Sequence, residues 1–330
     1  MPEDILLSVR NLSKSFPVGG GLFRKPRAWV RAVEQVSFQV RRKESFGLVG
    51  ESGCGKTTLG RMVLRLIEPS SGSILFQGVD LLTLDKKALR SVRPRLQIIF
   101  QDPYSCLDPR MKVGEIITEP LRASTSMSRS QRKQRAIELL EKVGLRASDL
   151  ERFPHEFSGG QRQRIGIARA LAGQPELVVA DEPVSALDVS IQAQVLNLLM
   201  DLQDEYGLSY LFISHDLSVV EHVCHKVAVM YLGRIVELAR VEDFKKQPRH
   251  PYTRSLKSSV PVPDPERPWQ PVPLEGDVPS PVSPPTGCSF HPRCAYALEP
   301  CATERPELIE VGDSHWVACW LNQGRGILGD

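Results

Sequence analysis

The segment GESGCGKTT, residues 50–58, carries the residue types that hold phosphate groups in proteins. Gly50, Gly55, Lys56 and Thr57 fit the pattern G-x-x-x-x-G-K-S/T, in which glycines let backbone N–H groups wrap around phosphate oxygens. The pattern assigns the Lys56 charge to the β- and γ-phosphates and the Thr57 hydroxyl to Mg2+. The residues expected to contact the nucleotide are Gly50, Glu51, Ser52, Gly53, Cys54, Gly55, Lys56, Thr57 and Thr58. The segment predicts binding of a nucleoside triphosphate, because a chance glycine-rich turn would not match so many features.

Two adjacent carboxylates follow an apolar run, Leu177 to Ala180, further along the chain. Asp181 is expected to hold Mg2+ through water, and Glu182 to polarise a water for attack on the γ-phosphate. Taken alone, two solvated acids at the end of a strand are the better interpretation. Together with the phosphate loop, the pair favours nucleotide hydrolysis.

The surrounding sequence predicts the elements that position these residues. A strand is expected over ESFGLVG, residues 44–50, and a helix after the loop, with Leu59, Val63, Leu66 and Ile67 on one face until Glu68-Pro69 ends it. A second helix is predicted after Asp188 from Ile191, Val195, Leu198, Leu199 and Leu202. Further strands are predicted at LQIIF, LVVAD, YLFIS and KVAVMY. Because strands alternate with helices, the fold class is α/β, with the phosphate loop between a strand and a helix.

A second anion site is predicted in FSGGQRQRIGIARAL, residues 157–171. Ser158, Gly159 and Gly160 precede a helical pattern, so a hydroxyl and free backbone donors lie at a helix N-terminus. The run Ser158–Gln161 resembles the SGGQ signature of ABC transporter ATP-binding subunits. In that family two subunits enclose two ATP molecules, and the phosphate loop of each faces the signature of the other. The resemblance implies that Ser158, Gly159, Gly160 and Gln161 contact ATP in an obligate ATPase dimer.

Four more motifs resemble those of the family and occur in the expected order. Gln101 in IIFQDP matches the glutamine that reaches Mg2+ and the attacking water, and Asp188 in SALD matches the loop that crosses to the partner's site. His215 in LFISHD matches the histidine that contacts the γ-phosphate, although a lone histidine is more often structural. Phe16 matches the aromatic residue that stacks on adenine. The resemblance implies an active ATPase in which Thr57, Gln101 and Asp181 hold Mg2+, and Glu182, His215 and Gln101 serve catalysis.

The same resemblance sets the domain organisation. Residues 1–250 are expected to form the nucleotide-binding domain, with an inserted helical subdomain at 101–160 that includes the helical pattern SRSQRKQRAIELLEKVG. In the family this subdomain receives the coupling helices of the membrane subunits. Residues 104–120 are the candidate docking surface, although ordinary packing inside the subdomain explains them nearly as well.

Residues 251–330 are expected to form a C-terminal extension. RHPYTRSL, residues 249–256, resembles the HPYT box of oligopeptide and dipeptide importer ATPases. Ten prolines in residues 261–285 predict an extended, semi-rigid connector. The insert GGGLFRKPRAW, residues 19–29, resembles that of the F-type subunit of such importers.

Four of the seven cysteines, Cys288, Cys294, Cys301 and Cys319, lie in this extension. Four thiolates suit either tetrahedral zinc or an iron–sulfur cluster, but the C-x-x-C pairs usual for zinc ribbons are missing. In the peptide-importer family this pattern is associated with a four-iron four-sulfur cluster, which the resemblance therefore implies here. Zinc and plain free thiols are the alternatives. Cys54 is interpreted as a loop spacer, and Cys106 and Cys224 as small buried side chains.

The charge balance and hydrophobicity of the chain limit its expected partners and location. The 42 basic residues nearly balance the 39 acidic ones, so nothing indicates a nucleic-acid partner. No apolar run reaches the length of about 20 residues that spans a bilayer, and the first residues lack a signal-peptide layout, which predicts a cytosolic chain. The resemblance implies a peptide-importer ATPase at the cytoplasmic face of the cell (inner) membrane. Its expected partners are a second ABC ATPase subunit in a heterodimer, two permease subunits and, indirectly, a solute-binding protein.

Two alternative functions remain open at this point. Related importers share the C-terminal extension, so the solute could be nickel or another small molecule in place of a peptide. A soluble ABC ATPase acting on nucleic acid or ribosomes is the alternative from another class. Such proteins normally show two nucleotide domains in one chain or an inserted coiled coil, and the sequence shows neither pattern.

Overall fold

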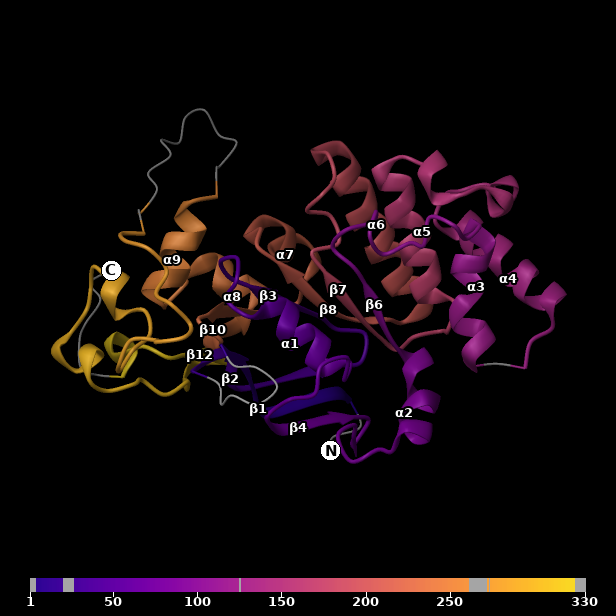
Figure 1. Ribbon diagram of the computed structural model, residues 1–330. Coiled ribbons are helices and arrows are strands. Elements are labelled where there is room, and N and C mark those ends of the chain that lie inside the picture. Colours follow the sequence, from indigo (N-terminus) through magenta and orange to yellow (C-terminus); the bar gives the residue numbers. More distant parts are fainter. Residues whose placement is uncertain (1–3, 20–26, 125, 261–271, 273, 324–330) are drawn as a thin grey trace. The chain divides into compact units, whose positions relative to one another are not determined.

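The computed structural model describes residues 4–19, 27–124, 126–260, 272 and 274–323 (Figure 1). The chain divides into two compact units. The first comprises Met1–Leu7, Gln39–Ser45 and Leu75–Ile213, and the second Ser8–Phe38, Phe46–Ile74 and Ser214–Asp330. Most of the predicted insert at 19–29, and residues 261–271 and 273 of the proline-rich connector, lie outside the described residues.

Parallel strands form the centre of the first unit. β6 (Leu96–Ile99) pairs with β7 (Leu177–Asp181), and β7 pairs with β8 (Ser209–Ser214). Every residue of β7 and β8 is buried, as expected for parallel strands with both faces covered. The predicted strands LQIIF, LVVAD and YLFIS are therefore confirmed.

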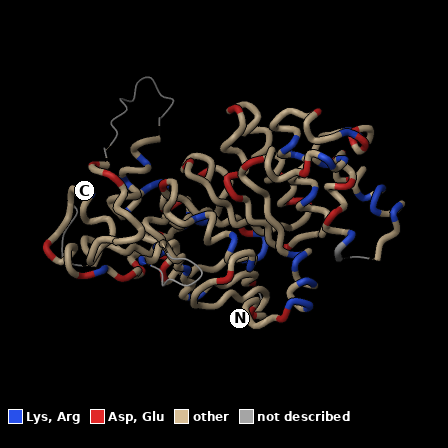
Figure 2. The backbone as a smooth tube through the Cα atoms, viewed as in Figure 1, with Lys and Arg blue, Asp and Glu red and all other residues tan. Residues whose placement is uncertain are grey.

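Helices make up most of the rest of the first unit, and α3, α4 and α5 pack against one another (Figure 1). The helices are α2 (Lys86–Val92), α3 (Val113–Ser124), α4 (Arg129–Lys142), α5 (Gly159–Leu171) and α6 (Val189–Tyr206), with 3-10 turns η1 (Arg93–Arg95), η2 (Ala147–Glu151) and η3 (Pro154–Glu156). Ser128 and Gln131 form a capping box that starts α4, which confirms the predicted helix. Lys and Arg residues are frequent in α2 and α4, where the backbone is coloured blue in Figure 2.

The second unit contains two groups of strands. One runs in the order β2 (Ala28–Arg41), β1 (Ile5–Val18), β4 (Ser71–Phe76), and β4 continues into the first unit, where it pairs with β5 (Val79–Asp80). The other runs in the order β11 (Ile309–Gly312), β12 (His315–Val317), β10 (Arg234–Arg240), β9 (Lys226–Tyr231), β3 (Ser45–Val49). β3 and β9, which the sequence predicts, pair in parallel, whereas β9, β10, β12 and β11 pair antiparallel.

The helix after the phosphate loop, α1 (Lys56–Val63), ends a turn earlier than the sequence predicts. Arg65 takes a left-handed backbone conformation, with φ of +48°. The N–H of Leu66 then donates to the carbonyl oxygen of Arg61 at 2.8 Å, as in a Schellman C-cap. Leu66 follows this turn and is 48% exposed, so it does not continue the buried face of α1.

The remaining helices of the second unit are short. They are α7 (Leu217–Val223), α8 (Val241–Lys246) and α9 (Pro251–Ser258), followed by the 3-10 turns η4 (His291–Arg293), η5 (Glu299–Ala302) and η6 (Trp320–Asn322). Within the described part of the chain, none of the helices has both the length and the apolar character needed to cross a membrane.

Candidate functional site

The phosphate loop lies between β3 and α1 in the second unit. Gly50 and Gly55 have φ of +153° and +106°. A Cβ at Gly50 would lie 2.2 Å from the carbonyl oxygen of Met230, and one at Gly55 would lie 2.0 Å from that of Ala32. Both distances are too short for any side chain, so the backbone of β9 and β2 requires glycine at both positions.

Lys56 folds back over this loop, and the residue is only 5% exposed. Its Nζ donates to the carbonyl oxygens of Gly50 at 2.7 Å and Glu51 at 3.0 Å. Phosphate oxygens are stronger partners for an ammonium group than these carbonyls, so the side chain is already held where an anion would bind. Burial raises the pKa of the Cys54 thiol, which keeps this spacer neutral.

Glu51 has two further partners that the sequence analysis missed. Its backbone N–H donates to Oη of Tyr252 at 2.9 Å. Its carboxylate forms an ion pair with Arg293 at 2.8 Å. No local sequence pattern indicates these contacts, because both partners come from residues 234–323, which we call the C-terminal segment.

In the first unit, two of the predicted residues, Gln101 and Glu182, contact each other beside the end of β7. Asp181 is the last residue of the strand and is 2% exposed. Glu182 has φ of +46°, and its N–H donates to Ile213 O at 2.9 Å. Gln101 Nε2 donates to Glu182 Oε2 at 2.8 Å. A non-glycine residue rarely adopts such a conformation, and the surrounding hydrogen bonds hold it in place.

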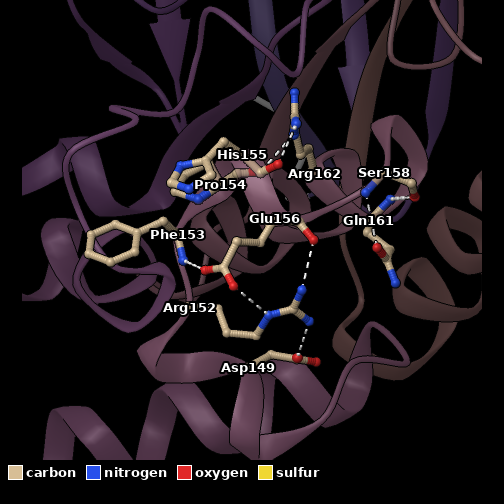
Figure 3. Close-up of polar contacts among 9 residues, drawn as sticks. All are labelled: Asp149, Arg152, Phe153, Pro154, His155, Glu156, Ser158, Gln161 and Arg162. Atoms are coloured by element: carbon tan, nitrogen blue, oxygen red, sulfur yellow. Dashed lines mark hydrogen bonds and ion pairs between the residues drawn. The ribbon is translucent and has the colours of Figure 1, made fainter.

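The predicted signature residues occupy the start of α5 (Figure 3). Ser158 is the N-cap, and its Oγ accepts from the N–H of Gln161 at 3.3 Å while Gln161 Oε1 accepts from the N–H of Ser158 at 3.0 Å. A Cβ on Gly160 would lie 2.5 Å from Cγ2 of Ile191 in α6. Gly160 therefore has a packing role, whereas the space beside Gly159 shows only ordinary contacts.

A polar network that the sequence analysis missed precedes this turn (Figure 3). The Arg152 guanidinium pairs with Asp149 at 3.1 Å and with Glu156 at 3.4 Å. Arg162, on the first turns of α5, donates from Nε to the carbonyl oxygen of Pro154 at 2.7 Å. These contacts fix the backbone that leads into Ser158.

Three further predicted residues are Asp188, His215 and Phe16, of which the first two are exposed. Asp188 is the exposed N-cap of α6, without a side-chain capping bond, and the next residue, Val189, is 83% exposed. In the second unit, His215 directly follows β8 and is exposed. Phe16 lies on β1, half-buried, with Lys14 Nζ 5.1 Å from the ring centroid.

The four C-terminal cysteines lie close enough to influence one another. Burial raises the pKa of Cys319 to about 12, and the charges of Cys288, Cys294 and Cys301 add to the shift. Burial likewise raises the pKa of Cys288 to about 11. Across the residues that the structure describes, no group of three or more His, Cys, Asp or Glu side chains is placed to hold a metal ion. The predicted metal centre, iron–sulfur cluster or zinc, thus receives no support from this arrangement.

Comparisons with known proteins identify the family. Residues 33–185 match the ABC transporter family, and residues 236–301 match the C-terminal region of oligopeptide/dipeptide transporters. The chain is 56% identical over 317 residues to the probable peptide ABC transporter ATP-binding protein y4tS of Sinorhizobium fredii, covering 96% of this chain and 90% of the relative. The chain belongs to the ATP-binding proteins of peptide ABC transporters.

Two further comparisons agree with this family. The dipeptide transport ATP-binding protein DppF of Haemophilus influenzae is 50% identical over 315 residues, which cover 96% of each chain. A solved dimeric ATP-binding cassette, in a post-hydrolysis state with ADP and Pi, has a TM-score of 0.64 and 26% identity and covers 71% of this chain and 98% of its own. The predicted ABC ATPase fold is confirmed. The predicted resemblance to peptide-importer ATPases is confirmed as well.

Proposed function

We propose that this chain hydrolyses ATP to power the import of di- or oligopeptides. The observation that carries the proposal is the match of both the ABC region and the peptide-transporter C-terminal region within one chain of which 96% aligns with peptide-transporter relatives. The phosphate loop supports it, since Gly50, Gly55 and the buried Lys56 are already arranged as an anion-binding turn.

The roles predicted for individual residues follow from this function. In the second unit, the loop N–H groups and Lys56 bind the phosphates, Phe16 stacks on adenine and His215 contacts the γ-phosphate. In the first unit, Glu182 acts as general base, and its hydrogen bond to Gln101 supports this role. The residues predicted as Mg2+ ligands are Thr57 in the second unit and Gln101 and Asp181 in the first, and bound Mg2+ would neutralise phosphate charge.

The partners belong to the same proposal. We infer a peripheral position on the cytoplasmic face of the membrane, two permease subunits and an indirect link to a solute-binding protein. Asp188 and Ser158–Gln161 would face a second ABC subunit, and the exposed Val189 beside Asp188 is suited to such a contact. Residues 104–120 would receive the permeases.

An iron–sulfur cluster at Cys288, Cys294, Cys301 and Cys319 is part of the proposal. Four thiols are the number and kind of ligand that such a cluster requires, and the charges of the other three contribute to the raised pKa of Cys319. A cluster is larger than a single ion, so its ligands stand further apart than those of zinc. Anaerobic purification followed by iron and sulfide analysis tests this, and zinc without iron would contradict it.

Uptake in cells tests the transport function. A strain that lacks this chain should lose ATP-dependent uptake of labelled di- or oligopeptides. The wild-type gene should restore uptake, whereas Lys56→Ala, which removes the buried ammonium group, should not. Intact peptide uptake together with lost nickel uptake would instead establish the small-solute alternative.

A further inference from the structure

Glu51 in the phosphate loop is held through its N–H, its carbonyl and its carboxylate. Lys56 Nζ donates to the carbonyl oxygen at 3.0 Å, which is a contact within the loop. The other two come from the C-terminal segment: Tyr252 Oη accepts from the N–H at 2.9 Å, and Arg293 donates to both carboxylate oxygens at 2.8 and 3.2 Å. A bidentate guanidinium–carboxylate pair fixes orientation as well as distance.

Both residues are held by their own surroundings. Tyr252 is fully buried in α9, and the Arg293 side chain is only 6% exposed. Arg293 Nε also donates to the carbonyl oxygen of Glu275 at 3.3 Å. Groups with so little freedom lose little entropy when they hold a partner, so they can set the position of Glu51.

An aromatic cluster joins the cysteine-containing turn to the core. The Phe290 ring lies 5.4 Å from both Tyr231, the last residue of β9, and Tyr252, with edge-to-face and tilted geometries. Tyr231 and Tyr252 lie 4.7 Å apart. Phe290 is 2% exposed and precedes Arg293 by one 3-10 turn. Packing of Phe290 therefore fixes where Arg293 meets Glu51.

We propose that Arg293 and Tyr252 are positioning residues for the phosphate loop, so that affinity for ATP depends on the folded C-terminal segment. The inference rests on the proposed ATPase function. The reason is geometric: the loop binds phosphates through backbone N–H groups, and their direction depends on how the peptide planes around Glu51 are held. Neither residue touches the nucleotide in this proposal.

Equilibrium titration of the full-length chain with a fluorescent ATP analogue tests the proposal. Arg293→Ala should raise Kd about tenfold or more, because a charge-assisted bidentate contact is lost. Arg293→Lys should recover part of the affinity, since a lysine keeps the charge without the fork. Tyr252→Phe, which removes one hydroxyl with little change in packing, should also raise Kd. kcat at saturating ATP should change much less than Kd in all three variants.

Arg305→Ala is the matched control. Arg305 also belongs to the C-terminal segment and also pairs with a carboxylate outside it, that of Glu34 on β2, at 3.2 Å. Because Glu34 keeps its contact with Arg234 at 2.8 Å, this variant should bind ATP like the wild type. Unchanged Kd in folded Arg293→Ala and Tyr252→Phe, or an equal rise in Arg305→Ala, would overturn the inference. A wild-type chain that binds ATP but does not hydrolyse it would contradict the proposed function alone.

Discussion

Gln101 donates a hydrogen bond of 2.8 Å to the carboxylate of Glu182, although the two residues are 81 positions apart in the sequence. Glu182 sits in a left-handed conformation, with φ of +46°, directly after the buried strand β7. The hydrogen bond and the strained backbone together fix one orientation of this carboxylate. Such fixed orientation is what a general base requires, because the proton acceptor must face one water position.

Glu182→Gln should keep ATP binding and lower kcat about 100-fold or more, since an amide does not accept a proton from water. The amide oxygen can still accept the Gln101 hydrogen bond, so the fold should be unchanged. Steady-state phosphate release measures kcat, and titration with an ATP analogue measures Kd. Turnover close to wild type would remove Glu182 from the role of general base.

Gly160→Ala should lower the free energy of unfolding by about 1–3 kcal/mol, because the new methyl group meets Ile191 at 2.5 Å. Urea unfolding provides the measurement. Gly166→Ala is the control: the glycine lies in the same helix with open space around it, and alanine there should stabilise by about 0.5–1 kcal/mol. Adding Ile191→Ala to Gly160→Ala should cost less than the sum of the two single changes, and full additivity would contradict the steric explanation.

His250 should make stability fall as the pH is lowered. The side chain is buried, and burial lowers its pKa to about 4, although the charge of Glu237 opposes the shift. An unfolded histidine takes up its proton near pH 6.5, so between pH 6.5 and 4 the unfolded chain binds more protons. The free energy of unfolding should drop through this window by up to about 3 kcal/mol.

Urea unfolding at a series of pH values measures this contribution. His250→Asn keeps an acceptor for the N–H of Tyr252, which His250 now caps at 3.1 Å, and should flatten the slope between pH 6.5 and 4. His222→Asn, at an exposed position of α7, should leave the slope unchanged. Equal slopes in the wild type and His250→Asn would rule out His250 as the source.

The sequence predicts the phosphate loop and the main strands because their requirements are local. Only glycine fits where a Cβ would lie 2.0 Å from a carbonyl oxygen, and apolar residues are needed where a strand is buried on both faces, so the residue types reveal both features. The residue types do not reveal the end of α1, because Arg65 occupies the left-handed position where glycine is usual. The α6 pattern was right for Val195, Leu199 and Leu202, which are buried, whereas Ile191 and Leu198 are half-buried.

Contacts between distant segments could not be predicted in this way. Arg293 and Glu51 are 242 residues apart, and each is an ordinary charged residue in its own surroundings. The cysteine residue type and the family resemblance predicted metal ligands, but only folding decides whether four thiols meet at one point. The phosphate loop was therefore predictable from the sequence, whereas the residues that hold it from the C-terminal segment were not.

Glu237 is a fully buried carboxylate that joins three parts of the C-terminal segment. It accepts from the backbone N–H groups of Arg249 and His250, each at 2.8 Å, and from Nε2 of His315 at 2.7 Å. Burial raises its pKa, but these hydrogen bonds outweigh burial and the net shift is downward. The carboxylate thus stays ionised in the fold, and the stability that it adds is lost as the pH falls below its unfolded value of about 4.3.

Glu237→Gln should lower the free energy of unfolding by about 3 kcal/mol, because one amide oxygen cannot replace two carboxylate oxygens and the new NH2 group faces N–H donors. Hydrogen exchange should speed up at the amides of Arg249 and His250 before it does in β7. The control is Glu310→Gln on β11, an exposed position whose carboxylate accepts one N–H, from Ser314 at 3.0 Å, and which should cost less than about 0.5 kcal/mol. Similar losses in the two variants, or unchanged exchange at residues 249 and 250, would show that the buried carboxylate does not hold this segment together.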